Sequence, residues 1–141
     1  MTDDEALKAP VFKLILMGDD QPDKSIQGIH ELEAELRTMQ RDEYPRSVNL
    51  LAPNGDILTI ALGAQFGFVQ HEDAASTSPT CSMAVDRSRL GAERKYREVD
   101  AGGTPTPIPE YACLPPEQVI RIVLDYAQHL KKPSDVDWQP L

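Results

Sequence analysis

Three adjacent residues, His71, Glu72 and Asp73, combine an imidazole with two carboxylates, the groups that hold zinc or transfer protons in enzymes. Neighbouring side chains of a strand point to opposite faces, so this run would not direct three ligands at one ion. The other two histidines, His30 and His129, each stand alone on predicted helices. We therefore predict no metal site and no catalytic residue here.

Other residues with reactive side chains also lack the partners that catalysis requires. Residues 76–78 read Ser-Thr-Ser without a GxSxG motif, and Gly102-Gly103 lacks the lysine and the strand-to-helix spacing of a phosphate-binding loop. An acidic pair such as Asp19 and Asp20 is typical of a solvated turn when no base or pocket accompanies it. The sequence therefore predicts neither an enzyme nor a bound cofactor, and a small hydrolase ranks behind two binding functions.

Local patterns predict the elements that must position these residues. Asn54-Gly55 between two alternating apolar runs indicates a tight hairpin. Pro116 followed by Glu117 favours a helix start, and apolar residues at steps of three and four continue that helix to Leu130. The predicted helices are 24–40 and 116–130. The predicted strands are 11–17, 46–51, 57–62, 63–69, 81–85, 92–99 and a short closing strand at 136–138. We expect Gly67 at a bulge and residues 102–109 as a loop or an edge.

Together these elements predict an α+β fold, an antiparallel sheet of about five or six strands with two main helices packed on one face. An antiparallel sheet can leave its other face in water, where it could serve as a broad recognition surface. We expect one domain over residues 1–141, with residues 1–9 as a flexible N-terminal tail and 73–80 as a mobile loop.

Composition favours a compact protein without membrane contact. The chain has 141 residues, of which 40% are hydrophobic, but no run approaches the ~20 apolar residues that span a bilayer. The N-terminus opens with acids where a secretory signal has basic residues, so we expect a cytoplasmic protein. Cys81 and Cys113 lie far apart without a CxxC pattern, which favours reduced thiols over a disulfide.

Two long segments carry a family resemblance. After the turn at Gly102 and Gly103 the chain reads IPEYACLPPEQVIRIVLDYAQHLKKP and ends in VDWQPL, and upstream it reads IHELEAELRTMQRDEYPRSVNLLAPNGDILTIALGAQFGFVQHE. This order resembles the Imm-one family of immunity proteins, which accompany polymorphic bacterial toxins, over most of the chain beyond about residue 25. The resemblance implies that the protein binds a cognate toxin domain and occludes its active site.

The charge of the chain bears on what it could bind. The formal net charge is -9, and residues 1–43 carry 11 acidic side chains against 5 basic ones. Such a protein is unsuited to direct nucleic-acid binding, but it suits a basic protein partner. A nuclease or nucleic-acid deaminase toxin would be such a partner, because it needs a positive substrate surface. The alternative is an acidic protein-interaction or regulatory module unrelated to toxins.

The residues that we predict to bind the partner are acids in turns and two aromatic residues: Asp19, Asp20, Asp23, Glu72 and Asp73, with Phe66 and Phe68 as apolar anchors. The two phenylalanines lie two positions apart and share a strand face, so they could equally belong to the core. We expect Trp138 to pack the C-terminal tail against the second predicted helix. We expect the free protein to be a monomer or a small homo-oligomer.

Overall fold

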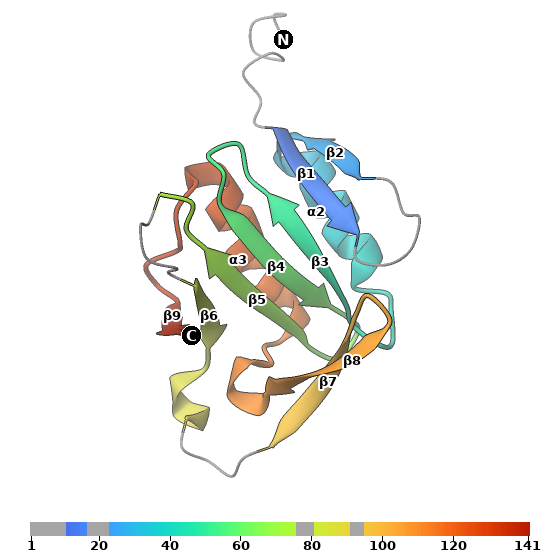
Figure 1. The fold of residues 1–141 in the computed structure, drawn as a ribbon, viewed down its shortest axis with the longest axis vertical. Helices are drawn as coiled ribbons and strands as arrows, with labels where there is room; N and C mark the ends of the chain where they lie inside the picture. Colours follow the sequence, from blue (N-terminus) through green and yellow to red (C-terminus); the bar gives the residue numbers. More distant parts are fainter. Residues whose placement is uncertain (1–10, 17–22, 76–80, 91–94) are drawn as a thin grey trace, which may run out of the picture.

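The computed structural model describes residues 11–16, 23–75, 81–90 and 95–141 (Figure 1). Its helices are α2 (Gly28–Met39) and α3 (Pro116–His129), with two short 3-10 helices, η1 (Arg87–Arg89) and η2 (Glu110–Ala112). The strands are β1 (Val11–Leu16), β2 (Lys24–Gln27), β3 (Arg46–Leu51), β4 (Ile57–Leu62), β5 (Gly67–Glu72), β6 (Cys81–Val85), β7 (Tyr96–Ala101), β8 (Thr104–Pro109) and β9 (Asp137–Pro140).

All nine strands of the described ranges belong to one sheet, whose main path runs in the order β2-β1-β3-β4-β5-β6-β9. Every neighbouring pair along this path is antiparallel. The β7–β8 hairpin joins the sheet beside β3 through a single parallel pair, Arg46 with Asp100. The predicted Asn-Gly hairpin is confirmed, because β3 and β4 pair along their whole length and Gly55 between them has a φ of 93°.

Both helices pack on one face of this sheet, the far side in Figure 1. Pro116 is at the start of α3, where the missing N–H has no helical acceptor to lose. The helix ends at Leu130, whose left-handed φ of 54° breaks the helical path. The main core is formed by alternate strand residues and the inner stripes of both helices, including Leu14, Val48, Leu50, Leu58, Ile60, Val69, Leu32, Leu36, Val119, Ile122 and Val123.

A second apolar cluster lies on the opposite face, where the β7–β8 hairpin crosses one end of the sheet (Figure 1). Val99 and Ile108 of the hairpin point inward and are 2% and 7% exposed. They pack over residues of β4, β5 and β6, among them Ala61, Phe68 and Val85. The hairpin therefore covers one end of this face, together with Ala112 of η2 and the adjacent Cys113, while α2 and α3 lie on the other side of the sheet.

The sheet has more strands than the five or six that we predicted, and the reasons are local. Lys24–Gln27 forms β2, whereas the sequence predicted that these residues begin the helix. Ile26 pairs with Phe12 of β1 and both side chains are fully buried, which favours the extended state over a first helical turn. Gly28, at a φ of 83°, then allows the chain to turn from strand into helix.

In the C-terminal two thirds of the chain one prediction is confirmed and two change. The segment with three prolines, predicted as a loop or an edge, is the edge strand β8. The third strand is Gly67–Glu72 rather than 63–69. Gly67 pairs in regular register with Leu62, and its N–H and C=O both bond to Leu114, so it is a point of close backbone approach and not a bulge.

Some of the predictions concern residues that the structure does not describe. Asp19, Asp20, the proposed tail 1–9 and most of the proposed loop 73–80 lie outside the described ranges. Within those ranges Cys81 and Cys113 are free thiols, and burial raises the pKa of the Cys113 thiol to about 11. No helix in the described part of the chain is long and apolar enough to cross a membrane.

Candidate functional site

The sheet face opposite α2 and α3 is the near side in Figure 1, and several antiparallel strands form it. Because antiparallel partners face the same side, the strand registers give two rows of side chains on this face. The first row is Lys13, Leu51, Ile57, Glu72 and Cys81, and the second is Ile15, Asn49, Thr59, Gln70, Met83 and Gln139. Met83 is 5% exposed and belongs to the second cluster, so the second row is covered at that point. We call these two rows the open face.

The open face combines an apolar patch with uncharged polar side chains. Leu51 and Ile57 are cross-strand partners on β3 and β4, and Ile15 of β1 lies diagonal to Leu51; all three are half-buried. Thr59 donates a hydrogen bond from Oγ1 to Oδ1 of Asn49 at 2.9 Å, which fixes two polar groups next to this patch. A broad, mixed surface of this kind is typical of protein–protein interfaces and differs from the concave sites that bind small molecules.

The acids predicted to bind a partner do not gather at one point. Glu72 is exposed on the open face, and Asp23 is exposed at the other end, 3.8 Å from the Nζ of Lys13. Three strand spacings separate Lys13 from Glu72, or about 14 Å. Asp73 is half-buried in the turn after β5, where its Oδ1 accepts a hydrogen bond from the N–H of Ala75. Glu72 and Asp23 therefore lie at opposite ends of this face, and Asp23 is the one that is paired with a lysine.

The two predicted apolar anchors lie in the second cluster, under the hairpin. Phe66 is 9% exposed and Phe68 is 5% exposed. The guanidinium carbon of Arg97 lies 4.7 Å from the centre of the Phe66 ring and covers it further. Phe66 immediately precedes β5, so the two residues do not share a strand as predicted, although both rings enter the same cluster. The burial of both rings agrees with the alternative that Phe66 and Phe68 belong to the core of the free protein.

His71, the histidine of the adjacent trio, points to the helical face and is 3% exposed. Its Nε2 lies 3.1 Å from Oδ2 of Asp56, which makes Nε2 the donor because an ionised carboxylate only accepts. Tyr126 of α3 donates its hydroxyl to the same Oδ2 at 2.6 Å. Asn54 Nδ2 and the N–H of Ala74 also donate to this carboxylate, at 3.1 and 3.0 Å.

The Asp56 carboxylate is therefore a buried anion with several donors. Burial alone would raise the pKa of Asp56, but the hydrogen bonds from Tyr126, Ala74 and His71 outweigh it and hold the pKa below its usual value. Burial, followed by the bond to Asp56, raises the pKa of Tyr126. Glu72 faces away from this cluster, so the three adjacent residues do not share a ligand site, and no group of three metal-binding side chains occurs among the described residues.

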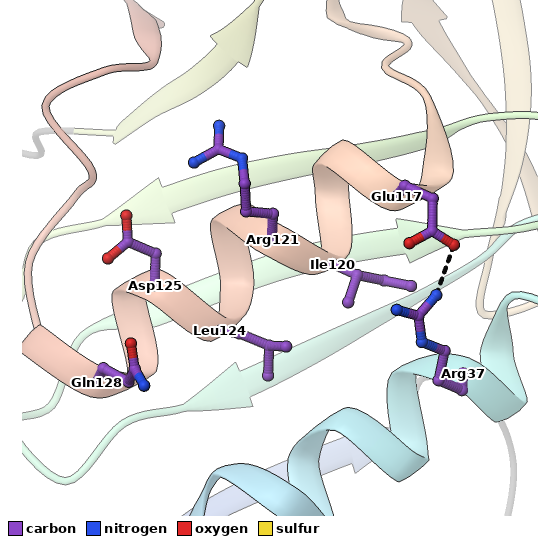
Figure 2. A pocket seen from close by; sticks show the side chains of 7 residues that line it. All are labelled: Arg37, Glu117, Ile120, Arg121, Leu124, Asp125 and Gln128. Carbon is purple, nitrogen blue, oxygen red and sulfur yellow. Dashed lines mark hydrogen bonds and ion pairs between the residues drawn. The ribbon is translucent and has the colours of Figure 1, made fainter.

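On the helical side, α2 and α3 border a groove of about 400 Å³ (Figure 2). Its lining is Arg37 of α2 with Glu117, Ile120, Arg121, Leu124, Asp125 and Gln128 of α3. Figure 2 shows Ile120 and Leu124 directed toward α2, while Arg121 and Asp125 point away from it.

The charged residues of the groove are already paired within the protein. Arg37 bonds to Glu117 at 2.5 Å and closes one end, and Arg121 bonds to Asp135 at 3.1 Å. Asp125 lies 3.5 Å from His129. The hydrogen bond from Arg37, with a second from Gln40, holds the pKa of Glu117 below its usual value. Because these charges are matched internally, the open face is the stronger candidate for binding another protein.

Sequence reasoning did not find the exposed aromatic residues next to the open face. Tyr44, which precedes β3, is 46% exposed, and Tyr96 of β7 is 58% exposed. Tyr44 donates its hydroxyl to Oε2 of Glu98 at 3.4 Å, which places it beside β7. The alternation of Tyr96, Glu98 and Asp100 around the buried Val99 was the available signal for the outward side of β7.

A comparison with protein-family models gives one informative result. The model of immunity protein Imm1 matches residues 23–140, which is most of the chain and includes all elements from β2 to β9. Searches of curated proteins and of solved structures gave no match. The match confirms the resemblance carried by the two long segments: the chain belongs to the Imm1 family of immunity proteins.

Proposed function

We propose that this protein binds a cognate toxin domain of a polymorphic toxin system and neutralises it by covering its active site. The observation that carries the proposal is the Imm1 family match over residues 23–140. An immunity protein must act where the toxin would otherwise act on its own cell, so we place it in the cytoplasm. Neither catalysis nor a cofactor has a part in this mechanism, since occlusion requires only tight binding.

The toxin that we propose is a nuclease or a nucleic-acid deaminase. Such enzymes hold phosphates in a positive groove, and a protein of net charge -9 is attracted to that groove over a long range. The exposed Glu72 would then take the place of a substrate phosphate. The charge would act mainly on the rate of association, whereas the apolar patch and its polar neighbours would slow dissociation.

The open face is the surface that we propose for this contact. From β1 to β9 it spans five strand spacings, or about 24 Å, and its two rows cover a planar area of roughly 300 Å². A complex of standard size buries about 800 Å² on each partner, so the interface must extend beyond the two rows. The outer side of the β7–β8 hairpin adjoins them, because the hairpin packs on the same face of the sheet.

The direct test uses the toxin domain encoded beside this gene. Purified protein is mixed with that domain, the mass of any complex is measured under native conditions, and toxin activity is assayed with and without the protein. We expect a stoichiometric complex without activity. Absence of a complex would contradict the proposal and favour the acidic interaction or regulatory module, whereas a complex that retains full activity would exclude occlusion as the mechanism.

A further inference from the structure

We propose that the outer side of the β7–β8 hairpin binds an arginine side chain of the protein partner, with Tyr44, Glu98 and Tyr96 as the receiving groups. The inference rests on the proposed function, since it names the group of the toxin that this surface receives. We call these three residues the tyrosine–glutamate stripe.

The alternation of side chains along β7 presents two of the three residues outward. Val99 is 2% exposed in the second cluster, and Arg97 turns inward over Phe66, so Tyr96 and Glu98 point to the other side. Residues two positions apart on a strand lie about 7 Å from each other. Tyr96 and Glu98 are thus exposed neighbours on one side of the hairpin.

Tyr44 reaches the same place from a distant part of the sequence. β3 and β7 run parallel where Arg46 pairs with Asp100, and the N–H of Asp100 donates to the carbonyl of Pro45 at 2.8 Å. In a parallel pair, positions two residues earlier on each chain again lie side by side, which aligns Tyr44 with Glu98. The hydrogen bond from the Tyr44 hydroxyl to Oε2 of Glu98, at 3.4 Å, agrees with this alignment.

The resulting chemistry fits a guanidinium group. Glu98 has two exposed tyrosines as neighbours, Tyr44 through its hydrogen bond and Tyr96 two positions along β7, and a carboxylate can accept more hydrogen bonds than the one from Tyr44. A planar guanidinium can lie against the rings while its N–H groups bond to the carboxylate, and it loses less hydration than a lysine ammonium on binding. The Arg97 side chain does not compete for this position, because it lies on the inner side of the hairpin.

The hairpin also holds the stripe in place before any partner binds. Three prolines in β8 restrict its backbone, and two of them stand opposite the stripe, Pro109 across from Tyr96 and Pro107 across from Glu98. Val99 and Ile108 fix the inner side of the hairpin in the second cluster. A receptor that is already ordered loses less conformational entropy on binding, which increases affinity.

The test measures the affinity of the toxin domain encoded beside this gene for four variants. We expect Tyr96→Ala and Glu98→Gln each to weaken binding about tenfold, because they remove a ring and the charge that face the guanidinium. Tyr44→Phe keeps its ring and should change affinity less than about twofold. Glu31→Gln, which removes an exposed acid on α2, is the matched control and should also stay within about twofold.

The outcomes separate this inference from the proposed function. If wild-type protein neutralises the toxin and both Tyr96→Ala and Glu98→Gln bind as well as wild type, the stripe is not the binding site although immunity stands.

If wild-type protein forms no complex, the proposed function fails, and NMR titration with N-acetyl-arginine amide decides the inference instead. Saturable shifts of Glu98 and of the Tyr44 and Tyr96 rings, lost in Glu98→Gln and weaker with the lysine analogue, would support it. No shifts, or equal shifts with the lysine analogue, would overturn it.

Discussion

Asp56 shows how a single buried charge can be tolerated in a small fold. The residue is 6% exposed, and its carboxylate accepts hydrogen bonds from β5, from α3 and from its own turn. A buried carboxylate without donors would be very unfavourable, but here each oxygen has a partner. The cluster therefore ties the β3–β4 turn to the C-terminal half of α3, two segments about 70 residues apart.

We predict that Tyr126→Phe lowers the free energy of unfolding by about 1–3 kcal/mol at pH 7, because it removes a buried donor to an ionised carboxylate. The folded-state pKa of Asp56 lies below its usual value. Its stabilisation is therefore fully present above the unfolded pKa of about 3.9 and is lost as the pH falls through the folded pKa. Without the Tyr126 hydroxyl that pKa should rise, so the difference between the two proteins should narrow at acidic pH.

Urea unfolding of wild type and Tyr126→Phe at a series of pH values from neutral to acidic checks this expectation. Tyr111→Phe, at a half-buried tyrosine of the second cluster, is the matched control and should follow wild type throughout. An equal loss of stability at every pH would contradict the prediction, because it would mean that the Tyr126 hydroxyl acts independently of the charge on Asp56.

At the scale of elements, the strand β2, which the sequence predicted as helix, shows what local patterns leave out. Asn54-Gly55 specifies its hairpin within a few residues, and the helix after Pro116 carries its own start signal and apolar stripe. Lys24–Gln27, in contrast, is extended only because Ile26 meets Phe12 of β1. Its state depends on a partner strand, which propensity and periodicity within a short window do not contain.

The candidate site was predictable to a similar extent. An antiparallel sheet with helices on one face implied an open face, and Glu72 was expected on the binding surface. Tyr44 and Glu98 are 54 positions apart, and a single parallel pair between β3 and β7 brings them together. No local pattern predicts such a pairing. For Phe66 and Phe68, strand alternation predicted correctly that the two rings share one environment. It did not predict that the β7–β8 hairpin covers them.

β8 shows why an exposed edge need not lead to aggregation. Pro105, Pro107 and Pro109 cannot donate to β7, so the donors to β7 are Thr104, Thr106 and Ile108, whose partners on β7 are Ala101, Val99 and Arg97. The positions that face the free edge are then the prolines, which offer carbonyls but no N–H groups. An added strand could form only half of its hydrogen bonds there, which disfavours pairing with a second chain.

Gly67 connects the sheet to the start of α3, and a side chain there should disturb both. A Cβ at this position would lie 2.8 Å from the carbonyl oxygen of Ala61 and 2.9 Å from Cγ2 of Val119. We predict that Gly67→Ala lowers the free energy of unfolding by about 1–3 kcal/mol through overpacking. Chemical denaturation measures the change, with Ala64→Ser at a nearby exposed position as the control. A loss no larger than that of Ala64→Ser would show that the backbone relaxes without cost.

At the scale of the whole molecule, the two sides of the sheet differ in how far their apolar residues are covered and their charges paired within the protein. On the helical side the apolar residues are covered by α2 and α3, and the charges around the groove form ion pairs within the protein. On the open side Ile15, Leu51 and Ile57 remain half-buried beside polar groups that α2 and α3 do not cover. The hydrophobic gain grows with the apolar area that a partner removes from water, so these half-buried residues can still gain where the fully buried residues of the helical side cannot.

This asymmetry gives a prediction that distinguishes the two sides with one kind of substitution. Thr59→Arg places a long cationic side chain near the middle of the open face, where it would obstruct a partner and repel a basic one. Gln128→Arg adds the same side chain at the groove between α2 and α3. Gln128 is exposed, so Gln128→Arg should unfold within about 1 kcal/mol of wild type. Thr59 is half-buried and bonds to Asn49, so Thr59→Arg also loses that hydrogen bond and should stay within about 2 kcal/mol of wild type, still folded. We expect Thr59→Arg to weaken toxin binding by about 100-fold or more and to abolish neutralisation, and Gln128→Arg to retain both. Calorimetry and a toxin-survival assay check these results. The reverse pattern, in which only Gln128→Arg fails, would assign toxin binding to the helical side and leave the open face without this function.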